Sequence, residues 1–403
     1  MRVALLSRGA HPLHEGGGLE RAVFDLARHL ERRGVETVLF TRPPTRAGAF
    51  PGEVVAVPYG PEASHGRVLD RTLRYPRFAR RLGALVAERV RRGAVDLVDA
   101  QGLCALGYGR LRARDPRLRA PLVMNPQGME EHRARGLKRL ALARLRRLSR
   151  EAARRADRVV ATDEGTRDDV PRLLGVDPRR VVVLPNGVDL DAVARLTPAD
   201  PRAAVAAALP ALGEAAPLLL SVGRVEPYKG FDDVLAALVQ LHTGGRLGAG
   251  WAWALAGAGR GARPAVPPAV APHVHFVGRV GDELLHALYA RADVFVHATR
   301  FEGSSLVTLE AMAHARPVVA TRAGGIPDKV VDGETGRLVP PGDVAALAEA
   351  LAGLLAAPES ARAMGERGRE RVRERFAWPA LAERTVALYE ELIAAARARE
   401  PRA

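Results

Sequence analysis

Short runs of β-branched residues alternate with longer segments rich in Ala, Leu and Arg along most of this chain. Such alternation is typical of βα units, in which a helix connects two parallel strands and packs on their sheet. The sequence therefore predicts an α/β fold with mostly parallel sheets. In the first half we expect strands at 3–7, 37–40, 54–57, 97–99, 122–125, 159–162 and 181–184, with helices at 18–33, 75–92, 136–155 and 166–174. In the second half we expect strands at 218–222, 251–256, 273–277, 294–297 and 318–320.

The length of 403 residues suits two domains of near-equal size. A segment rich in Pro, Asp and Ala, from Asn186 to Pro217, separates the two series of strands. We therefore assign 1–186 to an N-terminal domain and 187–378 to a C-terminal domain. Pro379 then interrupts a helical pattern and favours a break or a kink there.

The stretch Phe301–Ala313 follows a strand-like run and holds two glutamates, Glu302 and Glu310, on either side of a Gly-Ser-Ser turn. The apolar spacing after the turn suits a helix, so Glu302 lies in the loop and Glu310 lies one or two turns into the helix. The free amide groups and positive dipole of a helix N-terminus suit a diphosphate, and Glu310 could accept hydrogen bonds from a ribose diol. A sugar nucleotide contains both groups. The residues expected to bind such a ligand are Gly303, Ser304, Ser305, Leu306, Val307 and Glu310.

Further motifs lie on either side of this stretch, in this order along the chain: Leu184–Asp189, Ser221–Gly230, Leu255–Gly259, Val274–Arg279, Arg316–Thr321 and Gly324–Pro327. With the two glutamates (an E-x7-E pattern), this set resembles the retaining glycosyltransferases of family 4 over almost the whole C-terminal half. The resemblance implies the GT-B fold, which has two Rossmann-like domains with an interdomain cleft. It also implies that the final helix, expected at 380–396 within the segment 379–403, crosses back to the N-terminal domain.

The resemblance implies that a sugar moves, with retention, from a nucleoside diphosphate donor to an acceptor hydroxyl. The C-terminal domain would hold the donor and the N-terminal domain the acceptor, which could be a lipid, a glycan or a small molecule. The catalytic residues would be Glu302, which holds hydroxyls of the donor sugar, and Arg224 and Lys229, which offset the charge of the departing diphosphate. The leaving phosphate oxygen would take the acceptor proton.

Four further positions, in three loops, come from the resemblance. Gly17 and Gly18 match a Gly-Gly-x-Glu loop near the N-terminus and would help to bind the donor; a dinucleotide-binding loop fits less well, because the G-x-G-x-x-G spacing is absent directly after the strand. The loop that contains Arg279 would contact the nucleotide base. Many relatives have a histidine where Gln127 stands, and a glutamine can contact a sugar or acceptor hydroxyl but cannot titrate near neutral pH. His132 is an alternative for that role.

The net charge of +15 is concentrated in residues 1–200, which carry 38 Lys and Arg against 24 Asp and Glu. Residues 133–155 hold ten basic side chains and one acid, with leucines at roughly helical intervals. This pattern predicts a basic amphipathic helix that docks on an anionic membrane surface, or else a solvated helix face in a chain that uses arginine heavily. The segment contains no aromatic residue, so we expect no nucleic-acid partner.

No Asp-x-Asp motif ends a predicted strand, and we expect neither a metal nor a cofactor. The chain has no run of about 18 apolar residues, its start lacks the apolar core of a signal peptide, and Cys104 is its single cysteine. We therefore expect a cytoplasmic protein, peripheral on the inner face of the plasma membrane if the basic segment docks there. A sugar-nucleotide epimerase or a phosphorylase of the same architecture, and a membrane-binding protein with a vestigial donor site, are the alternatives.

Overall fold

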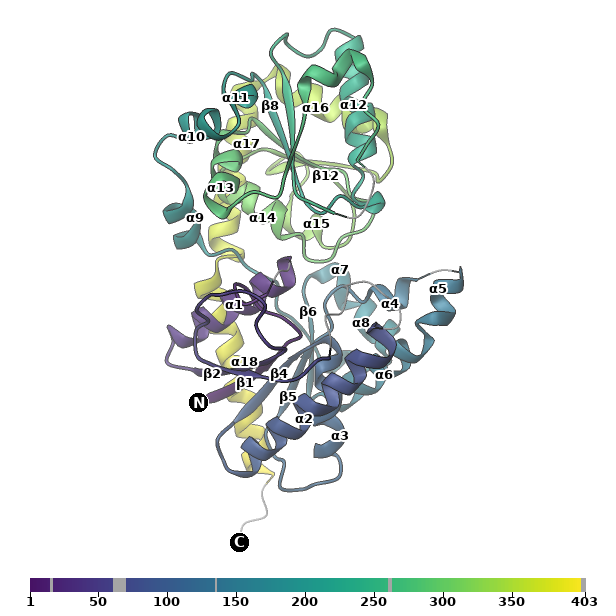
Figure 1. The fold of residues 1–403 in the computed structure, drawn as a ribbon, viewed down its shortest axis with the longest axis vertical. Helices are drawn as coiled ribbons and strands as arrows, with labels where there is room; N and C mark the ends of the chain where they lie inside the picture. The colour runs from purple at the N-terminus through teal and green to yellow at the C-terminus, as the bar shows by residue number, and fades with distance from the viewer. Residues whose placement is uncertain (15–16, 61–69, 135, 260–262, 400–403) are drawn as a thin grey trace. The chain divides into compact units, whose positions relative to one another are not determined.

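The computed structural model describes residues 1–14, 17–60, 70–134, 136–259 and 263–399. The chain divides into two compact units, one formed by Met1–Asn186 with Trp378–Ala403 and the other by Gly187–Ala377. Each unit has its own parallel sheet with helices on both faces (Figure 1), so the predicted α/β class is confirmed. Trp378, which the sequence analysis assigned to the second domain, belongs to the first unit.

The described residues of the first unit form a seven-stranded parallel sheet in the order β3-β2-β1-β4-β5-β6-β7. Its strands are β1 Arg2–Leu6, β2 Glu36–Thr41, β3 Glu53–Ala56, β4 Leu97–Gln101, β5 Leu122–Asn125, β6 Arg158–Ala161 and β7 Val181–Val183. Its helices are α1 Gly18–Glu31, α2 Tyr75–Arg91, α3 Ala105–Arg112, α4 Glu130–Arg133, α5 Gly136–Ala141, α6 Ala143–Arg155, α7 Glu164–Arg167, α8 Asp169–Leu174 and α18 Trp378–Ala398, with short turns at Asp70–Arg74, Gly102–Cys104 and Pro178–Arg180.

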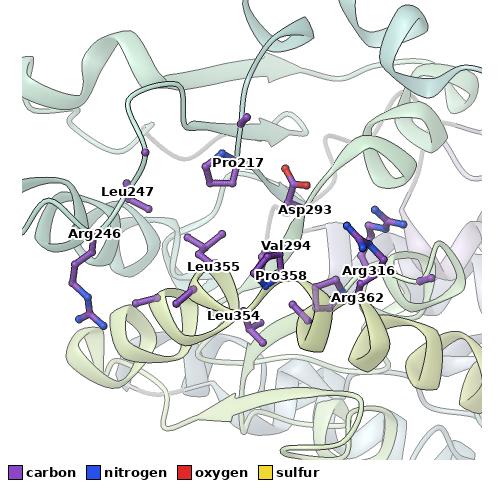
Figure 2. A pocket seen from close by; sticks show the side chains of 17 residues that line it. Pro217, Arg246, Leu247, Asp293, Val294, Arg316, Leu354, Leu355, Pro358 and Arg362 are labelled. Atoms are coloured by element: carbon purple, nitrogen blue, oxygen red, sulfur yellow. The ribbon is translucent and has the colours of Figure 1, made fainter.

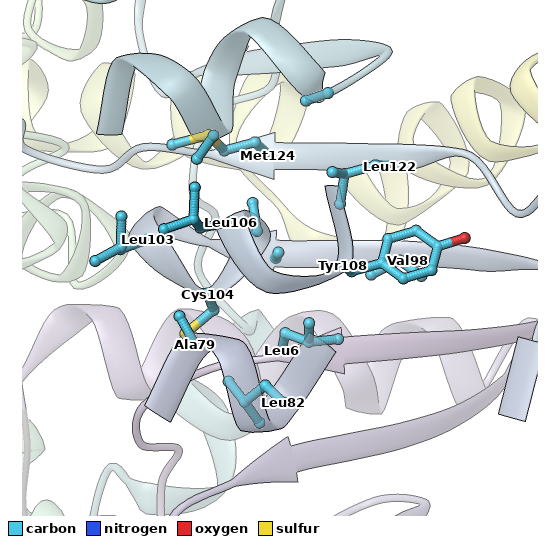
Figure 3. Packing of buried hydrophobic residues seen from close by; sticks show 14 of the residues in the cluster. Leu6, Ala79, Leu82, Val98, Leu103, Cys104, Leu106, Tyr108, Leu122 and Met124 are labelled. Atoms are coloured by element: carbon cyan, nitrogen blue, oxygen red, sulfur yellow. The ribbon is translucent and has the colours of Figure 1, made fainter. Parts of the chain in front are cut away.

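Alternate residues of the central strands point to two separate cores, as expected for a sheet covered on both faces. On one face, α2, α3 and α6 cover the sheet; Leu6, Val98 and Met124 from three strands pack there with Leu82 of α2 and Leu106 of α3 (Figure 3). On the other face, α1 and α18 cover the sheet (Figure 1). Full burial of a side chain of this size contributes about 1.5–3 kcal/mol, so these two layers supply most of the stability of the unit.

The final helix α18 packs within the first unit although it follows the whole second unit in sequence. Its Tyr389 hydroxyl donates a hydrogen bond to Oδ2 of Asp99 on β4 at 2.5 Å, and Trp378 at its start stacks on His29 of α1. Glu391 also pairs with Arg158 at 2.8 Å. The predicted return of the last helix to the N-terminal part of the chain is confirmed.

The described residues of the second unit form a six-stranded parallel sheet in the order β10-β9-β8-β11-β12-β13. Its strands are β8 Leu218–Val222, β9 Ala252–Ala256, β10 Val274–Gly278, β11 Val294–His297, β12 Val318–Thr321 and β13 Gly336–Val339. Its helices are α9 Leu190–Leu196, α10 Pro201–Ala208, α11 Pro210–Gly213, α12 Phe231–Thr243, α13 Asp282–Arg291, α14 Leu306–Ala313, α15 Ile326–Lys329, α16 Val344–Ala356 and α17 Pro358–Arg375, with short turns at Pro227–Lys229 and Pro268–His273. Helices α12 and α16 cover one face of this sheet, and α13 and α14 cover the other (Figure 1).

Two predicted helices are each divided in the structure. The segment 136–155 forms α5 and α6, because Leu142 between them leaves helical geometry and is only 1% exposed. The segment 166–174 forms the end of α7 and all of α8, and α7 begins after Asp163, whose carboxylate accepts the amide of Thr166 at 2.7 Å. Asp163 is therefore the N-cap residue of α7.

In the parts of the chain that the structure describes, no individual helix has the length and apolar composition to cross a membrane. Helices α16 and α17 meet such a criterion only when taken together, and they are bent by 104° relative to each other. Leu347 and Leu351 of α16 are buried in the core of the second unit.

Candidate active site

The strand order of the second sheet defines a switch point between β8 and β11. Strands β9 and β10 lie to one side of this pair, and β12 and β13 lie to the other. Ligands of open parallel sheets bind outside the carboxyl ends of the strands at such a point. The loop after β8 carries Arg224 and Lys229, and the loop after β11 carries Glu302 and leads into α14. The second unit therefore gathers the predicted catalytic residues at one edge of its sheet.

Two glycines allow these loops to pack closely. Gly230 has φ +68°, and a Cβ at this position would lie 1.9 Å from the carbonyl oxygen of Ala298 at the end of β11. Gly324, with φ +53°, has the same relationship to the carbonyl oxygen of Glu302. Any side chain at either position would force the backbones apart. These contacts fix the loop of Glu302 between the loops that follow β8 and β12.

Glu302 accepts hydrogen bonds from three directions. Its Oε2 lies 2.6 Å from Nζ of Lys229 and 2.8 Å from Nε2 of His297, and its Oε1 accepts the amide of Gly303 at 3.2 Å. The side chains of Lys229 and Glu302 are only 11% and 14% exposed, and His297 is fully buried. A carboxylate held in this way has one orientation, which is what recognition of a ligand hydroxyl requires.

The ionisation of this cluster follows from its contacts. Burial raises the pKa of Glu302, but the hydrogen bond from His297, together with the charge and hydrogen bond of Lys229, outweighs burial and lowers the pKa below its ordinary value. Burial lowers the pKa of His297, although its bond to Glu302 opposes this change. We therefore assign an ionised Glu302 and a neutral His297 that donates through Nε2. The Nδ1 of His297 is then a buried acceptor without a hydrogen bond among the described residues.

The N-terminus of α14 is left without a side-chain cap. Ser305 precedes the helix with φ +35°, and its hydroxyl bonds to Oγ1 of Thr308 at 2.7 Å instead of to a backbone amide. The hydroxyl of Ser304 is buried and has no hydrogen bond among the described residues. Residues other than glycine, such as Ser305, seldom have a positive φ, and backbone strain of this type is concentrated at functional sites. The first amides of α14, with the helix dipole behind them, suit an anionic ligand.

Glu310 lies on the second turn of α14 and is held from one side only. Its Oε2 accepts the hydroxyl of Tyr289 at 2.9 Å, and its Oε1 makes no hydrogen bond among the residues described. Tyr289 stacks on His314 with ring centroids 5.6 Å apart, and Nε2 of His314 lies 2.9 Å from Nδ1 of His286. Burial and the charge of His286 lower the pKa of His314 to about 3, so this support is neutral at pH 7. Glu310 thus has one fixed oxygen and one available oxygen.

Arg224 is exposed and donates from Nη2 to the hydroxyl of Tyr228 at 2.8 Å. The ring of Tyr228 also lies 5.6 Å below Nζ of Lys229. Arg300 fixes the same turn, because its backbone amide donates to the carbonyl of Tyr228 at 2.7 Å and its guanidinium pairs with Asp233 at 2.6 Å. Tyr228 therefore connects the two cations predicted to bind a diphosphate.

Comparisons with known proteins agree with this architecture. Residues 16–192 match the family model described as Glycosyltransferase Family 4, and residues 216–357 match the one described as Glycosyl transferases group 1. D-inositol 3-phosphate glycosyltransferase 2 of Catenulispora acidiphila is 32% identical over 98% of this chain and 96% of that protein. The chain belongs to glycosyltransferase family 4.

Two solved structures share the GT-B fold of this family 4 enzyme. Sucrose-phosphate synthase from Thermosynechococcus elongatus aligns over 98% of this chain and 99% of its own, with a TM-score of 0.78 and 25% identity. Anabaena HepE, solved in complex with UDP-glucose, aligns over 97% of this chain and all of its own, with a TM-score of 0.71 and 19% identity. The predicted fold and the predicted glycosyltransferase activity are confirmed.

The structure distributes the other predicted site residues over both units of the glycosyltransferase. Arg279 is exposed on the loop after the edge strand β10, away from the β8–β11 switch point in strand order. Gly17 and Gly18 belong to the first unit, whereas Gly303 and the residues that follow it belong to the second. The amide of Gly17 donates to Glu20 at 2.8 Å, and a Cβ at Gly17 would contact nothing within 4 Å. Packing within the unit therefore does not require a glycine there.

Gln127 follows β5 in the first unit and has φ +56°. Its Nε2 donates to Oε1 of Gln101 at 2.7 Å, and Gln101 in turn donates to Asp99 at 3.2 Å. Tyr389 of α18 donates to the same Asp99 carboxylate and completes this chain of hydrogen bonds. The last helix therefore supports Gln127, the predicted contact residue. His132, the alternative, has a side chain that is 1% exposed, and burial lowers its pKa.

Three residues of the site, His297, Tyr289 and Tyr228, are not among those predicted from the sequence. His297 ends a buried strand and cannot be distinguished from its apolar run; a polar residue five positions before Glu302 is the available signal. Tyr289 and Tyr228 lie in a helix and a turn that the sequence does not connect to Glu310 or Arg224. Their roles depend on tertiary contacts.

Two further features bear on ligands. Among the described residues, no group of three or more His, Cys, Asp or Glu could hold a metal ion.

A cavity of about 500 Å³ in the second unit is shown in Figure 2; Pro217, Val294 and Leu355 line it, with Arg316 and Arg362 among its polar residues. Pro217 precedes β8 and Val294 begins β11, so this cavity lies at the amino ends of the strands and is not the site described above.

Proposed function

We propose that this glycosyltransferase holds a nucleoside diphosphate sugar at the β8–β11 switch point and transfers its sugar with retention of configuration. The observation that carries the proposal is the joining of Lys229, Glu302 and His297 beside the uncapped start of α14. Amide groups and two nearby cations can receive a diphosphate, while an oriented carboxylate can accept hydroxyls of the sugar. The charge and the hydrogen-bonding groups of the site thus match both ends of the donor.

The chemical step that we propose needs no protein nucleophile. The bond between the sugar C1 and the diphosphate oxygen breaks, the acceptor oxygen bonds to C1 on the same face, and the acceptor proton moves to the leaving phosphate oxygen. Arg224 and Lys229 stabilise the charge that develops on that phosphate, and the effect is greatest when the charge is fully formed. Glu302, kept ionised by its neighbours, orients the sugar.

Glu310 supports binding of the ribose in this proposal. Because Tyr289 fixes Oε2, the remaining Oε1 has a defined position from which to accept a hydroxyl. HepE, a structural neighbour, was solved with UDP-glucose, so UDP-sugars are the first donors to test. A relative that acts on D-inositol 3-phosphate suggests phosphorylated polyols as the first acceptors.

The deciding experiment combines thermal unfolding with product analysis. We expect one UDP-, ADP- or GDP-sugar to raise the unfolding temperature of the parent protein, because a ligand of the folded state stabilises it by mass action. The same donor should yield a product with the anomeric configuration of the donor by NMR. Incubation without acceptor should leave the donor sugar unepimerised. Inversion at C1, or epimerisation without transfer, would contradict the proposal.

We further propose that α5 contacts an anionic membrane surface. Leu137 and Leu140 are 85% and 72% exposed, and Lys138 and Arg139 beside them are exposed as well. The predicted leucine stripe over 133–155 is not continuous, since Leu142 and Leu145 are buried in the core of the first unit. Two basic residues farther along have internal partners, since Arg150 donates to the carbonyl of Leu173 and Arg154 to that of Gly175. Arg135 lies outside the described residues.

Co-sedimentation with phosphatidylglycerol vesicles tests this surface. Replacement of Leu137 and Leu140 by Ser, or of Lys138 and Arg139 by Gln, should release the protein from vesicles, because each basic residue near such a surface contributes about 1 kcal/mol. Arg150→Gln is the matched control and should change binding little. Equal binding of all variants would favour a solvated helix.

A further inference from the structure

Two arginines lie at the carboxyl edge of the first sheet, on loops that follow neighbouring strands. Arg8 comes two residues after β1, and Arg42 directly follows β2. Strands β1 and β2 are paired in parallel with Leu6 opposite Phe40, so both loops begin at the same edge of the sheet. Strand β1 also borders β4, where the strand order reverses and where such sheets bind ligands.

Among the residues that the structure describes, Arg42 forms no ion pair with an acid. Its side chain is half-buried, it makes no ion pair or side-chain hydrogen bond among the described residues, and its Nε is buried without an acceptor. Burial lowers the pKa of the Arg42 guanidinium, and the charge of Arg8 lowers it further, despite the opposing charges of Glu20 and Asp70. A buried donor without an acceptor is costly, so this arginine is suited to a ligand rather than to the fold.

The nearest acids leave Arg42 unpaired among the described residues. Asp70 forms an ion pair with Arg8 at 3.9 Å and accepts the Tyr59 hydroxyl at 3.0 Å through the same oxygen, Oδ2. Glu20 accepts the amide of Gly17 at the start of α1. Arg8 also lies 5.1 Å above the ring of Tyr75, which fixes its position without neutralising its charge.

The backbone that carries Arg42 is held in place by His14. The Nε2 of His14 lies 3.1 Å from the carbonyl oxygen of Arg42 and 3.2 Å from that of Pro43, and its Nδ1 is near the backbone of Ala10. His14 is 2% exposed. The loops after β1 and β2 are thus tied together, and a ligand need not order them on binding.

We infer that Arg8 and Arg42 bind a phosphate monoester carried by the acceptor. Two guanidinium groups match the charge of a phosphate monoester, which is close to −2 at neutral pH, and each offers a planar pair of donors. The donor diphosphate is a different ligand, because Arg224 and Lys229 of the second unit serve it in the proposed function. This inference rests on that function, since it assigns the acceptor to the first unit.

Isothermal titration of the full chain with myo-inositol 1-phosphate, inorganic phosphate and myo-inositol tests the inference. The parent protein should bind both phosphate compounds and should bind the neutral polyol at least ten-fold more weakly. Arg42→Gln should weaken binding of the phosphate compounds about ten- to a hundred-fold, as expected for loss of charged hydrogen bonds. Its unfolding temperature without ligand should not fall, because Arg42 makes no side-chain hydrogen bond among the described residues.

Arg158→Gln is the matched control. Arg158 is 31% exposed, similar to the 25% of Arg8, but it begins β6 at the opposite edge and pairs with Glu391. It should leave phosphate binding unchanged. Equal affinity of the parent and Arg42→Gln for phosphate would overturn the inference, as would equal affinity of the parent for inositol and its phosphate.

Two additional measurements extend the test. One shows whether the phosphate monoester belongs to a lipid or to a soluble acceptor, and the other shows whether a negative result contradicts this inference or the proposed function. Vesicles that contain phosphatidic acid present the same monoester on a lipid, and binding of these in preference to the soluble ester, with loss in Arg42→Gln, would assign the phosphate to a lipid acceptor. Stabilisation by a nucleotide sugar reports on the second unit. If that stabilisation persists while phosphate fails to bind, only this inference is wrong; if it is absent, the proposed function fails.

Discussion

The Nζ of Lys229 lies 2.6 Å from Oε2 of Glu302, although the two residues are 73 positions apart in the sequence. The contact exists because β8 and β11 are neighbours, so the loops that follow them meet at one edge of the sheet. In the proposed function, Lys229 divides its hydrogen bonds between Glu302 and the donor diphosphate, and its three donor hydrogens permit both contacts. The ion pair therefore holds the Lys229 ammonium group in position before the donor binds.

Replacement of Lys229 by Ala should lower turnover more than it lowers donor affinity. The charge on the leaving diphosphate is greatest in the transition state, so a cation there contributes more to the rate than to binding. We expect a loss in kcat of about a hundred-fold or more, comparable to loss of one preorganised electrostatic contact in other enzymes. Steady-state kinetics and a separate titration of donor binding measure the two effects.

The same substitution leaves Glu302 buried without its cation, which carries its own cost in stability. The double variant Lys229→Met with Glu302→Gln removes both charges and should unfold at a higher temperature than Lys229→Met alone. Arg224→Ala is a useful comparison, because Arg224 is exposed and its loss should not destabilise the unit. A kcat for Lys229→Ala equal to that of the parent would remove Lys229 from the mechanism.

Glu310→Gln should weaken donor binding about ten- to a hundred-fold, since a hydrogen bond to a charged group contributes about 1.5–3 kcal/mol. Tyr289→Phe should have a smaller effect in the same direction, because it releases Oε2 without removing the carboxylate. Tyr108→Phe, which removes a hydroxyl bonded to the carbonyl of Ala120 in the first unit, is the control. Calorimetry with the preferred nucleotide sugar should rank the variants in this order, and unchanged binding by Glu310→Gln would exclude the ribose role.

Much of this architecture could be predicted from the sequence because it is local. Strand and helix periods gave the α/β class, and the turn before α14 correctly separated Glu302 in the loop from Glu310 in the helix. Contacts across the sheet were not predictable in the same way. His297 was indistinguishable from core residues of its strand, and its bond to Glu302 appears only when the loop folds back on β11.

The basic segment illustrates the same limit. Leucines at 137, 140, 142 and 145 predicted a single amphipathic face, but the helix breaks where Leu142 becomes buried. Packing against α3 and the sheet, which periodicity does not reveal, determines that some leucines face inward and others outward. Of these four leucines, only Leu137 and Leu140 of α5 are exposed.

Activity should persist in excess EDTA. In the proposed function, Arg224 and Lys229 supply the positive charge that a divalent ion would otherwise offer to the diphosphate, and the described residues offer no three-ligand metal group. Transfer should be measured in treated and untreated protein with the same donor. Loss of transfer that Mg²⁺ or Mn²⁺ restores would show that a metal is required.

The last prediction concerns Asp99, which is 5% exposed on β4 between Tyr389 and Gln101. Burial raises its pKa to about 6, although both hydrogen bonds oppose the change. Because the ordinary pKa is 3.8, the folded protein binds more protons than the unfolded chain between about pH 4 and 6. The contribution of Asp99 to the free energy of unfolding should therefore fall as the pH rises through this window, by about 3 kcal/mol at most, and then remain constant.

Asp99→Asn removes this titration, so its unfolding temperature relative to the parent should rise from pH 4 to 6 and level off above pH 7. Asp115→Asn should show the opposite sign in a lower window, because hydrogen bonds from Arg117 and Arg91 lower the pKa of Asp115 from 3.8. Stability from that group is present above its unfolded pKa and is lost as the pH falls below about 4, so the stability of the variant relative to the parent should decrease as the pH rises toward about 4 and then remain constant. A pH-independent difference for Asp99→Asn would mean that the carboxyl does not titrate in this window. Asp99 is also linked to Gln127 by hydrogen bonds through Gln101. If Gln127 contacts the acceptor, Asp99→Asn should raise the KM for the acceptor and leave donor binding unchanged.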